Sequence, residues 1–332
     1  MIISRTPFRI SFFGGGTDYP LWYKKNGGAV LSTSIDKYCY LSCRYLPPFF
    51  EHKTRVVWSK IETVGSVEEI QHPAVREVIK FLDIKDGLHI HHDADLPARS
   101  GLGSSSSFTV GLLNSLYTLL GQSPTKAQLA LQAIHVEQEL IKENVGSQDQ
   151  SAAAFGGFNK IEFGGSEHIR VSPVEISPSN IDLLQNHLLL FFTGLARSAS
   201  EIAAEQIRLT PQKTKELQLM RNMVDIAEGL LKQGDLDNFG RLLHEGWQIK
   251  KTLSPQVSNS AIDAIYEAGK SAGALGGKLL GAGAGGFILF FVKPSDQARV
   301  KASLSKLLYV PMKFENKGSQ IIFNNGTKTS NA

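Results

Sequence analysis

The sequence predicts an α+β fold, in which strands and helices interleave without a regular βα period. Residues 1–60 contain several short segments rich in β-branched and aromatic residues, which are typical of strands. A block of helical segments at about 197–272 comes before a second glycine-rich and strand-like region. The 332 residues are enough for two domains, and the polar stretch "SPSNIDLLQN" suggests a division into 1–183 and 184–324.

The elements of the first part follow from local patterns. "IISRTPFRISFF", "AVLSTSIDKYCYLSCRYL", "TRVVWSK" and "GLHIHHDADLP" are expected strands, and "HPAVREVIKFLDI" is an expected helix. A further helix is expected from about Ser105 to Leu120. "SPTKAQLALQAIHVEQELIKEN" predicts another, with Ser123 as its N-cap and Pro124 in its first turn. "GGFNKIEFGG" and "HIRVSPVEI" resemble the two arms of a hairpin.

The second part begins with a buried strand, "HLLLFFTG". Within the helical block, the individual helices are expected at about 197–209, 212–233, 235–251 and 259–272. "GGKLLGAGAGGFILFFVKP" then combines a glycine loop with a strand, and a last helix is expected at 295–307. "VPMKFEN" and "SQIIF" are expected to complete the sheet of this second part. Residues 325–332 are expected to be a disordered tail.

Composition limits the function classes. The net charge is only +4, from 35 Lys and Arg against 31 Asp and Glu, which gives no support for a nucleic-acid partner but is compatible with a small anionic one. We expect no membrane span, because no stretch of eighteen apolar residues occurs, and no signal peptide, because the N-terminus lacks its pattern. Cys39 and Cys43 are expected to be buried reduced thiols, so the predicted location is cytoplasmic.

The stretch "DLPARSGLGSSSSFTVGLLNSL", residues 95–116, has the chemistry of a phosphate site. A glycine loop that leads into a helix leaves backbone N–H groups unpaired, and the helix dipole adds to their attraction for anions. Gly101 and Gly103 let a phosphate approach the backbone, and the hydroxyls at 104–107 add donors and a possible Mg²⁺ ligand. The alternative is an ordinary N-capped helix after a flexible loop.

Two other glycine-rich segments point in different directions. "GAGAGG" at 281–286 matches GxGxxG, but its strand follows the loop instead of preceding it, so dinucleotide binding is excluded. A close backbone approach, to a ligand or to a neighbouring helix, is what remains. "GGGTDYP" at 14–20 ends in Asp18, which could bind sugar hydroxyls, although Asp is also common in turns. No GxxxxGK[ST] motif occurs anywhere.

Taken together, "TPFRISFFGGGTDYP", "PARSGLGSSSS" and "KLLGAGAGG" resemble, in this order, the three motifs of the GHMP kinase superfamily. The resemblance covers essentially the whole chain. It implies an N-terminal domain like ribosomal protein S5, a ferredoxin-like C-terminal α/β sandwich, and a site between them that uses ATP and Mg²⁺. Within the superfamily, "SFFGGGTDYP" and "FFTGLARSAS" are most similar to the D-glycero-D-manno-heptose 7-phosphate kinases, with fucokinase a close relative.

The resemblance also implies roles for single residues. The family's catalytic aspartate falls on Asp149 in "NVGSQDQSAA", and its neighbouring arginine falls on Arg9. Its Mg²⁺ carboxylate falls on Glu137, which we expect to share the ion with the Ser105 hydroxyl. Without the resemblance, Glu137 would be an ordinary solvated helix residue, and Arg9 a surface arginine on an edge strand.

Galactokinases carry Glu-His where this chain has Gly15 and Gly16, a departure that argues against galactose and opens room for a larger, phosphorylated sugar. Arg197 is the first candidate for the substrate phosphate, ahead of Lys24 and Arg99. The expected nucleotide-binding residues are Arg99, Ser100, Gly101, Leu102, Gly103, Ser104, Ser105, Ser106, Ser107 and Trp58. The expected substrate-binding residues are Gly15, Gly16, Thr17, Asp18, Arg197 and Gly283.

Some candidates have a more ordinary interpretation. Trp58 could stack on adenine, but a core or edge-strand aromatic is the stronger interpretation. His89, His91 and His92 invite a metal site, yet no third ligand on their face is evident, so polar strand residues are favoured. Lys278 is expected only to help shape the third glycine loop.

The predicted function is an ATP- and Mg²⁺-dependent sugar kinase. It would phosphorylate the anomeric hydroxyl of D-glycero-D-manno-heptose 7-phosphate, giving the 1,7-bisphosphate for nucleotide-activated heptose and surface polysaccharide. The alternatives are a kinase for another sugar, such as fucose, and a non-catalytic sugar sensor. The expected partners are ATP and a phosphorylated sugar, and the protein is expected to be a monomer or homodimer.

Overall fold

The computed structural model describes residues 1–98, 100–164, 169–195 and 199–325. Its larger sheet is built on two long antiparallel strands, β1 (Ile2–Phe13) and β2 (Gly28–Tyr45). The main path of this sheet runs β13-β1-β2-β5-β3-β4. Its shorter strands are β3 (Thr54–Val57), β4 (Ile61–Val64), β5 (Leu88–Ala94), β6 (Phe158–Phe163) and β7 (Ile169–Pro173). The predicted hairpin is confirmed, because β6 and β7 pair in antiparallel register.

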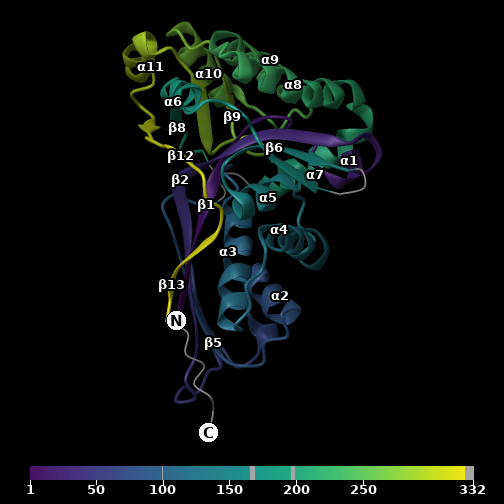
Figure 1. Ribbon diagram of the computed structural model, residues 1–332, viewed down its shortest axis with the longest axis vertical. Coiled ribbons are helices and arrows are strands. Elements are labelled where there is room, and N and C mark those ends of the chain that lie inside the picture. Colours follow the sequence, from purple (N-terminus) through teal and green to yellow (C-terminus); the bar gives the residue numbers. More distant parts are fainter. Residues whose placement is uncertain (99, 165–168, 196–198, 326–332) are drawn as a thin grey trace.

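One helix occupies the centre of the first half. α3 (Ser104–Leu119) packs on β1 and β2, and all but a few of its residues are buried, which accounts for the apolar sequence after the serines. The other helices of this half are α1 (Pro20–Asn26), α2 (Pro73–Phe81), α4 (Lys126–His135) and α5 (Gln148–Phe155). Figure 1 shows α2, α3 and α4 together beside the long strands.

The predicted start of α4 is wrong by two residues. Its N-cap is Thr125, not Ser123, and Thr125 forms a reciprocal capping box with Gln128. A hydroxyl followed three residues later by Gln or Glu satisfies two backbone donors at once, which explains why this start is favoured. After His135 the helix continues as one π-helical turn, Val136–Leu140.

The second half contains a four-stranded sheet in the order β11-β8-β10-β9. Its strands are β8 (Leu188–Phe192), β9 (Gly276–Leu279), β10 (Phe287–Phe291) and β11 (Leu308–Tyr309). The helices are α6 (Pro178–Asn186), α7 (Ala199–Leu209), α8 (Thr214–Gln233), α9 (Leu236–Lys251), α10 (Ser260–Ser271) and α11 (Gln297–Ser303). Strands and helices interleave in both halves, and the α+β prediction is confirmed.

The end of the chain returns to the first sheet. β12 (Phe314–Glu315) pairs with β2, and β13 (Gln320–Asn324) pairs with β1 in antiparallel register. Figure 1 shows β13 running along the long strands towards the N-terminus. The expectation that these segments complete the second sheet is therefore wrong. Their short apolar sequences fit either sheet, so only the path of the chain distinguishes the two.

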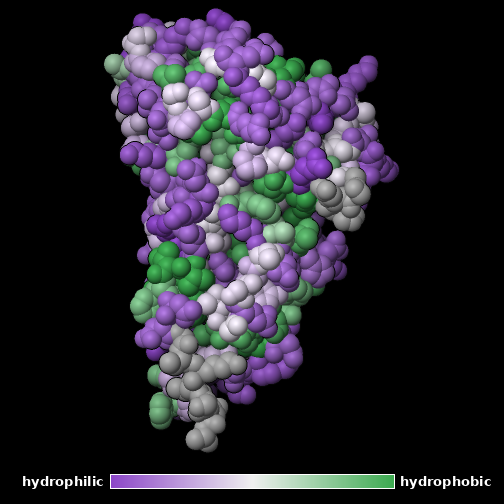
Figure 2. Space-filling view, viewed as in Figure 1, coloured by the Kyte–Doolittle hydropathy of each residue, from purple (hydrophilic) through white to green (hydrophobic). Residues whose placement is uncertain are grey.

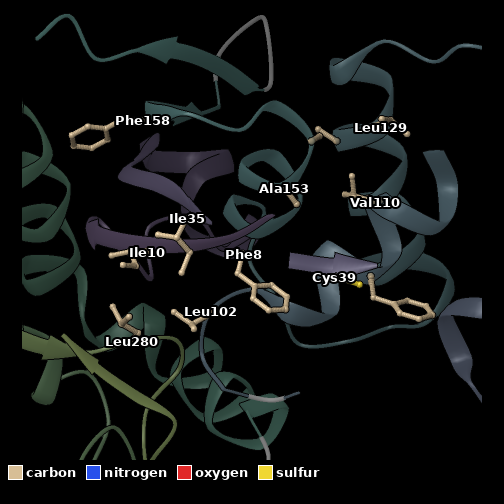
Figure 3. Packing of buried hydrophobic residues seen from close by; sticks show 14 of the residues in the cluster. Phe8, Ile10, Ile35, Cys39, Leu102, Val110, Leu129, Ala153, Phe158 and Leu280 are labelled. Atoms are coloured by element: carbon tan, nitrogen blue, oxygen red, sulfur yellow. The ribbon is translucent and has the colours of Figure 1, made fainter. Parts of the chain in front are cut away.

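The largest apolar cluster crosses the predicted domain boundary. It combines residues of the first half, such as Phe12 and Leu102, with Phe239, Leu280 and Phe291 of the second half. Phe12 packs edge-on against Phe239, with ring centroids 5.6 Å apart. Figure 3 shows Leu102 and Leu280 among the side chains of this cluster. The two halves share one core here, and the division at residues 183 and 184 stays a prediction.

The surface and the thiols add two observations. Cys39 and Cys43 are buried and unpaired, as expected. Hydrophilic residues cover much of the visible face in Figure 2, especially over the helices of the second half. Among the described residues, no helix has both the length and the apolar character needed to cross a bilayer. The predicted tail lies almost entirely outside the described residues, which end at Asn325.

Candidate active site

Asp149 and Arg9 form a two-pronged ion pair at the centre of the candidate site. Asp149 lies in the first turn of α5, and Arg9 projects from β1. Arg9 Nε donates to Asp149 Oδ1 at 2.9 Å, and Arg9 Nη2 donates to Oδ2 at 3.0 Å. The Arg9 side chain is 5% exposed and that of Asp149 is 27% exposed, so the carboxylate still faces accessible space. Such a fork holds a carboxylate in one orientation.

The same arginine anchors the predicted phosphate loop. Arg9 Nη1 donates to the carbonyl of Gly101 at 2.7 Å, and the Arg9 backbone N–H donates to the carbonyl of Leu102 at 3.0 Å. Gly103 is the N-cap of α3 and has φ +78°, a left-handed conformation that glycine adopts without strain. A Cβ on Gly103 would lie 3.5 Å from Asp149 Cγ. The start of α3 and the carboxylate are therefore neighbours.

The serines of the loop divide into distinct roles. Ser106 Oγ donates to Glu137 Oε2 at 2.9 Å, and Ser107 Oγ donates to the carbonyl of Pro7 at 2.8 Å. Ser105, the predicted Mg²⁺ ligand, is exposed in the first turn of α3. The residue in contact with Glu137 is thus Ser106, one position further along. The shift follows from helix geometry, because successive side chains in the first turn point about 100° apart.

Glu137 is buried in the π-helical turn and is a candidate metal ligand. Its Oε2 accepts from Ser106 and from the side-chain amide of Gln150. Its Oε1 is buried without a hydrogen-bond partner among the described residues. Burial raises the pKa of Glu137 to about 7, and the hydrogen bonds from Ser106 and Gln150 oppose that rise. A cation next to Oε1 would satisfy the free oxygen and favour the ionised form, so Mg²⁺ fits these residues.

Asp18 connects the first glycine segment to α5. It is 2% exposed, and its Oδ1 accepts from the backbone N–H of Gly16 at 2.9 Å. Its Oδ2 accepts from Gln148 Nε2 at 2.9 Å. Burial raises the pKa of Asp18, and the negative charge of Asp149 raises it further. Asp18 therefore has a structural role beside the predicted contact with the sugar.

The other residues of this segment differ in what they leave accessible. The Thr17 hydroxyl lies within hydrogen-bonding distance of the carbonyls of Gly14 and Ala29, and Thr17 is fully buried. Its side chain thus holds the turn together. By contrast, a Cβ on Gly15 would have only ordinary contacts, at 3.7 Å from Gln148 Nε2 and 3.9 Å from Ser11 Oγ. A small side chain would therefore fit at Gly15, and the room for a larger sugar stays a prediction.

The third glycine segment approaches other parts of the chain closely. A Cβ on Gly281 would lie 2.4 Å from Gly101 Cα, and one on Gly283 would lie 2.6 Å from the carbonyl oxygen of Val257. These positions admit no side chain, because the backbones are already in contact. The partners are the phosphate loop and the loop before α10, not a helix. For Gly283, the structure shows this packing against Val257, and its contact with substrate stays a prediction.

Several buried polar atoms around the site lack partners among the described residues. Buried donors and acceptors are usually paired, so an unpaired one beside a candidate site is available to a ligand. These unpaired atoms come from the first strand, the phosphate loop, the π-helical turn and the start of α5. The atoms are Ser11 Oγ, Ser100 Oγ, Glu137 Oε1, Gln148 Oε1 and Gln150 Oε1.

The remaining predicted residues have mixed outcomes. Arg99 and Arg197, the candidates for phosphate contacts, lie outside the described residues. Trp58 donates its Nε1–H to Glu62 Oε1 at 2.8 Å and packs edge-on against His72, so its contact with adenine stays a prediction. Lys24 is exposed on α1. Among the described residues, no group of three or more His, Cys, Asp or Glu side chains is arranged to hold a metal ion.

Two buried lysines lie closer to the site than the sequence suggested. Lys250 on α9 is 5% exposed, and its Nζ donates to the carbonyl of Gly281. Lys278 is also 5% exposed, and its Nζ donates to the carbonyl of Phe12 at 2.8 Å. In "GWQIKKTLS", Lys250 lies in a helical pattern next to another lysine. The local sequence therefore does not distinguish a buried lysine from a solvated one at this position.

Comparisons with known proteins agree with this architecture. The family model for the N-terminal domain of GHMP kinases matches residues 70–157, and that for the GHMP kinase C-terminal domain matches residues 226–310. A D-glycero-alpha-D-manno-heptose 7-phosphate kinase of Campylobacter jejuni subsp. jejuni serotype O:2 is 30% identical over 92% of this chain and 93% of its own length.

Two solved structures have the same fold over nearly the whole chain. A D-glycero-D-manno-heptose 1-phosphate kinase from Bacteroides thetaiotaomicron is similar with TM-score 0.78 and 24% identity, covering 98% of this chain and 99% of that one. A putative sugar kinase from Campylobacter jejuni has TM-score 0.74 and 27% identity, with coverage of 97% and 98%. The fold and the family models define a kinase. The chain belongs to the GHMP kinase family, as its three glycine-rich motifs predicted.

Proposed function

We propose that this kinase transfers the γ-phosphoryl group of ATP to the anomeric hydroxyl of D-glycero-D-manno-heptose 7-phosphate. The product would be the 1,7-bisphosphate. The observation that carries this proposal is the Arg9–Asp149 pair beside Gly103 at the start of α3, because it joins a carboxylate to a phosphate-binding helix start. The relative of 30% identity, a heptose 7-phosphate kinase, supports the choice of acceptor.

Phosphoryl transfer needs positioning and charge stabilisation more than covalent chemistry. Asp149 would accept the proton of the attacking hydroxyl, or orient that hydroxyl towards the γ-phosphorus. Arg9 holds both carboxylate oxygens and carries positive charge next to the point where charge develops on the transferred group. The backbone N–H groups in the first turn of α3 would bind the ATP phosphates.

Glu137 and Ser106 are the residues that would hold Mg²⁺, with Ser105 retained as the ligand that the resemblance implies. When bound, the ion would neutralise charge on the ATP phosphates. The unpaired Glu137 Oε1 is the feature of this chain that supports the assignment.

The acceptor would lie beside Gly15 and Asp18. Gly15 leaves space where a galactokinase has a side chain, which supports an acceptor with a longer carbon chain. Asp18 is held by Gly16 and Gln148, and Gln148 also presents a buried Oε1 that could accept from a sugar hydroxyl. Arg197 remains the candidate for the 7-phosphate, on the grounds of the resemblance.

The test is a coupled ADP-release assay with a panel of sugars, both free and phosphorylated at C6 or C7. We expect the highest kcat/KM for the heptose 7-phosphate, and a product whose ³¹P spectrum contains an anomeric phosphate coupled to H1. Asp149→Asn serves as the catalytic control. Higher kcat/KM for a free sugar, such as fucose, would reject the substrate assignment but keep the chemistry. ADP release that Asp149→Asn leaves unchanged would reject the mechanism as well.

A further inference from the structure

Lys250 is a buried cation at the junction of two glycine loops. It lies on the last turn of α9 and is 5% exposed. Its Nζ donates to the carbonyl of Gly281. Among the described residues, this carbonyl is the one acceptor for the three N–H groups of the ammonium. A buried ammonium with one neutral acceptor is costly, because desolvation penalises its charge.

The carbonyl that Lys250 holds belongs to the backbone packed against the phosphate loop. A Cβ on Gly281 would lie 2.4 Å from Gly101 Cα, so the two glycines are in contact. The Gly101 carbonyl in turn accepts from Arg9 Nη1 at 2.7 Å. Lys250 and Arg9 therefore hold two touching segments from the two halves of the chain. A change in the position of the Lys250 side chain would be passed to the Arg9–Asp149 pair through these few contacts.

The charges that face Lys250 come from four different elements. Arg9 on β1 carries positive charge, whereas Asp149 on α5 and Asp18 in the first glycine segment carry negative charge. Lys278 on β9 also faces Lys250, but burial lowers the pKa of Lys278 well below the ordinary lysine value and so disfavours its charged form. Burial, with a smaller effect from Arg9, lowers the pKa of Lys250 to about 8, and the two aspartates partly oppose this shift. Lys250 is thus part of the electrostatic environment of both carboxylates.

A residue selected only for packing would be apolar at this position. A methionine fills nearly the same volume without a buried charge, and replacing buried charges by apolar groups is often neutral or stabilising. Side chains that cost stability occur preferentially at functional sites.

On this basis we propose that Lys250 is a positioning residue of the phosphoryl-transfer site. Its ammonium holds the Gly281 carbonyl and keeps the phosphate loop in register with Arg9. Its positive charge offsets the negative charges of Asp18 and Asp149. The inference rests on the proposed kinase activity and adds to it a residue from the second half of the chain.

The experiment compares Lys250→Met, which removes the charge, with Lys250→Arg, which retains it. Lys251→Met is the matched control, because Lys251 is the next residue of α9 and pairs with Asp263 on α10. For each variant, kcat and KM for ATP and for the acceptor are measured as a function of pH, together with the thermal unfolding midpoint.

We expect Lys250→Met to lose kcat by about tenfold or more, since a charge beside the reacting groups is removed. Lys250→Arg should recover most of that loss, and Lys251→Met should behave like the wild type. The wild-type kcat should decline above about pH 8, where Lys250 loses its proton. Lys250→Arg should lack this decline, because a guanidinium keeps its proton.

Stability gives a readout that does not depend on activity. The lowered pKa means that the folded protein gains stability as pH rises from about 8 towards the ordinary lysine value of 10.5. Lys250→Met should therefore unfold at a temperature equal to or above that of the wild type at neutral pH, and this advantage should shrink at higher pH.

Two results would overturn the inference. One is an active wild type whose kcat and pH profile Lys250→Met leaves unchanged. The other is a Lys250→Met protein that is less stable than the wild type at neutral pH, which would make Lys250 a structural residue. A wild type that phosphorylates no acceptor would reject the proposed function instead, and the stability measurement would then decide about Lys250.

Discussion

Glu137→Gln tests the buried carboxyl of the candidate metal site. The substitution keeps the size and the acceptor oxygen of the side chain but removes its ability to ionise. Ser106 and Gln150 can still donate to the amide oxygen, so the local packing is preserved. The variant therefore isolates the cost of the negative charge.

The magnitude follows from the pKa. Burial raises the pKa of Glu137 from 4.5 to about 7, and each pKa unit corresponds to about 1.4 kcal/mol. Ionising Glu137 in the folded protein thus costs about 3 kcal/mol. The folded state binds the proton more tightly than the unfolded state, so the stability from the neutral form is complete below pH 4.5 and is lost as pH rises through about 7.

The assay is thermal unfolding followed by circular dichroism, with EDTA present. Near pH 8, Glu137→Gln should unfold at a temperature about 6 °C or more above the wild type, since about 1 kcal/mol shifts the midpoint of a protein of this size by about 2 °C. Near pH 4.5 the difference should almost vanish. Glu139→Gln is the matched control, because Glu139 lies exposed in the same turn. A gap of equal size at both pH values would show that the ionisation of Glu137 does not cause it.

Three further predictions concern the chemistry and the frame of the site. Asp149→Asn should lower kcat by about 10²–10⁴-fold without changing the unfolding midpoint by more than a few degrees, as measured by steady-state kinetics and calorimetry. Gly101→Ala should destabilise the protein by at least about 1–2 kcal/mol and raise KM for ATP. The reason is that φ of Gly101 is +82° and the new Cβ would lie 2.4 Å from the Leu280 carbonyl oxygen. An unchanged midpoint of urea unfolding would contradict this prediction. Thr125→Ala should cost about 1 kcal/mol in urea unfolding through the lost capping box with Gln128, and leave kcat unchanged.

Local patterns were sufficient for much of this protein. The glycine loop that opens α3, the strand before the first glycine segment and the run of helices from α7 to α10 follow from spacing and residue type over short windows. The same holds for the exclusion of dinucleotide binding at 281–286, because the order of loop and strand is a property of the sequence. Arg9 and Asp149, 140 positions apart, came from the resemblance of their motifs, and the structure brings them into contact.

Long-range packing accounts for the rest. The pairing of β13 with β1, the contact of Ser106 with Glu137 and the burial of Lys250 against Gly281 all join distant segments. A short apolar strand fits either sheet, and a lysine on a helix has the same local sequence whether it is solvated or buried. Burial and charge environment depend on which segments meet in space, so the pKa values and unpaired atoms of the site emerge only when the whole chain is folded.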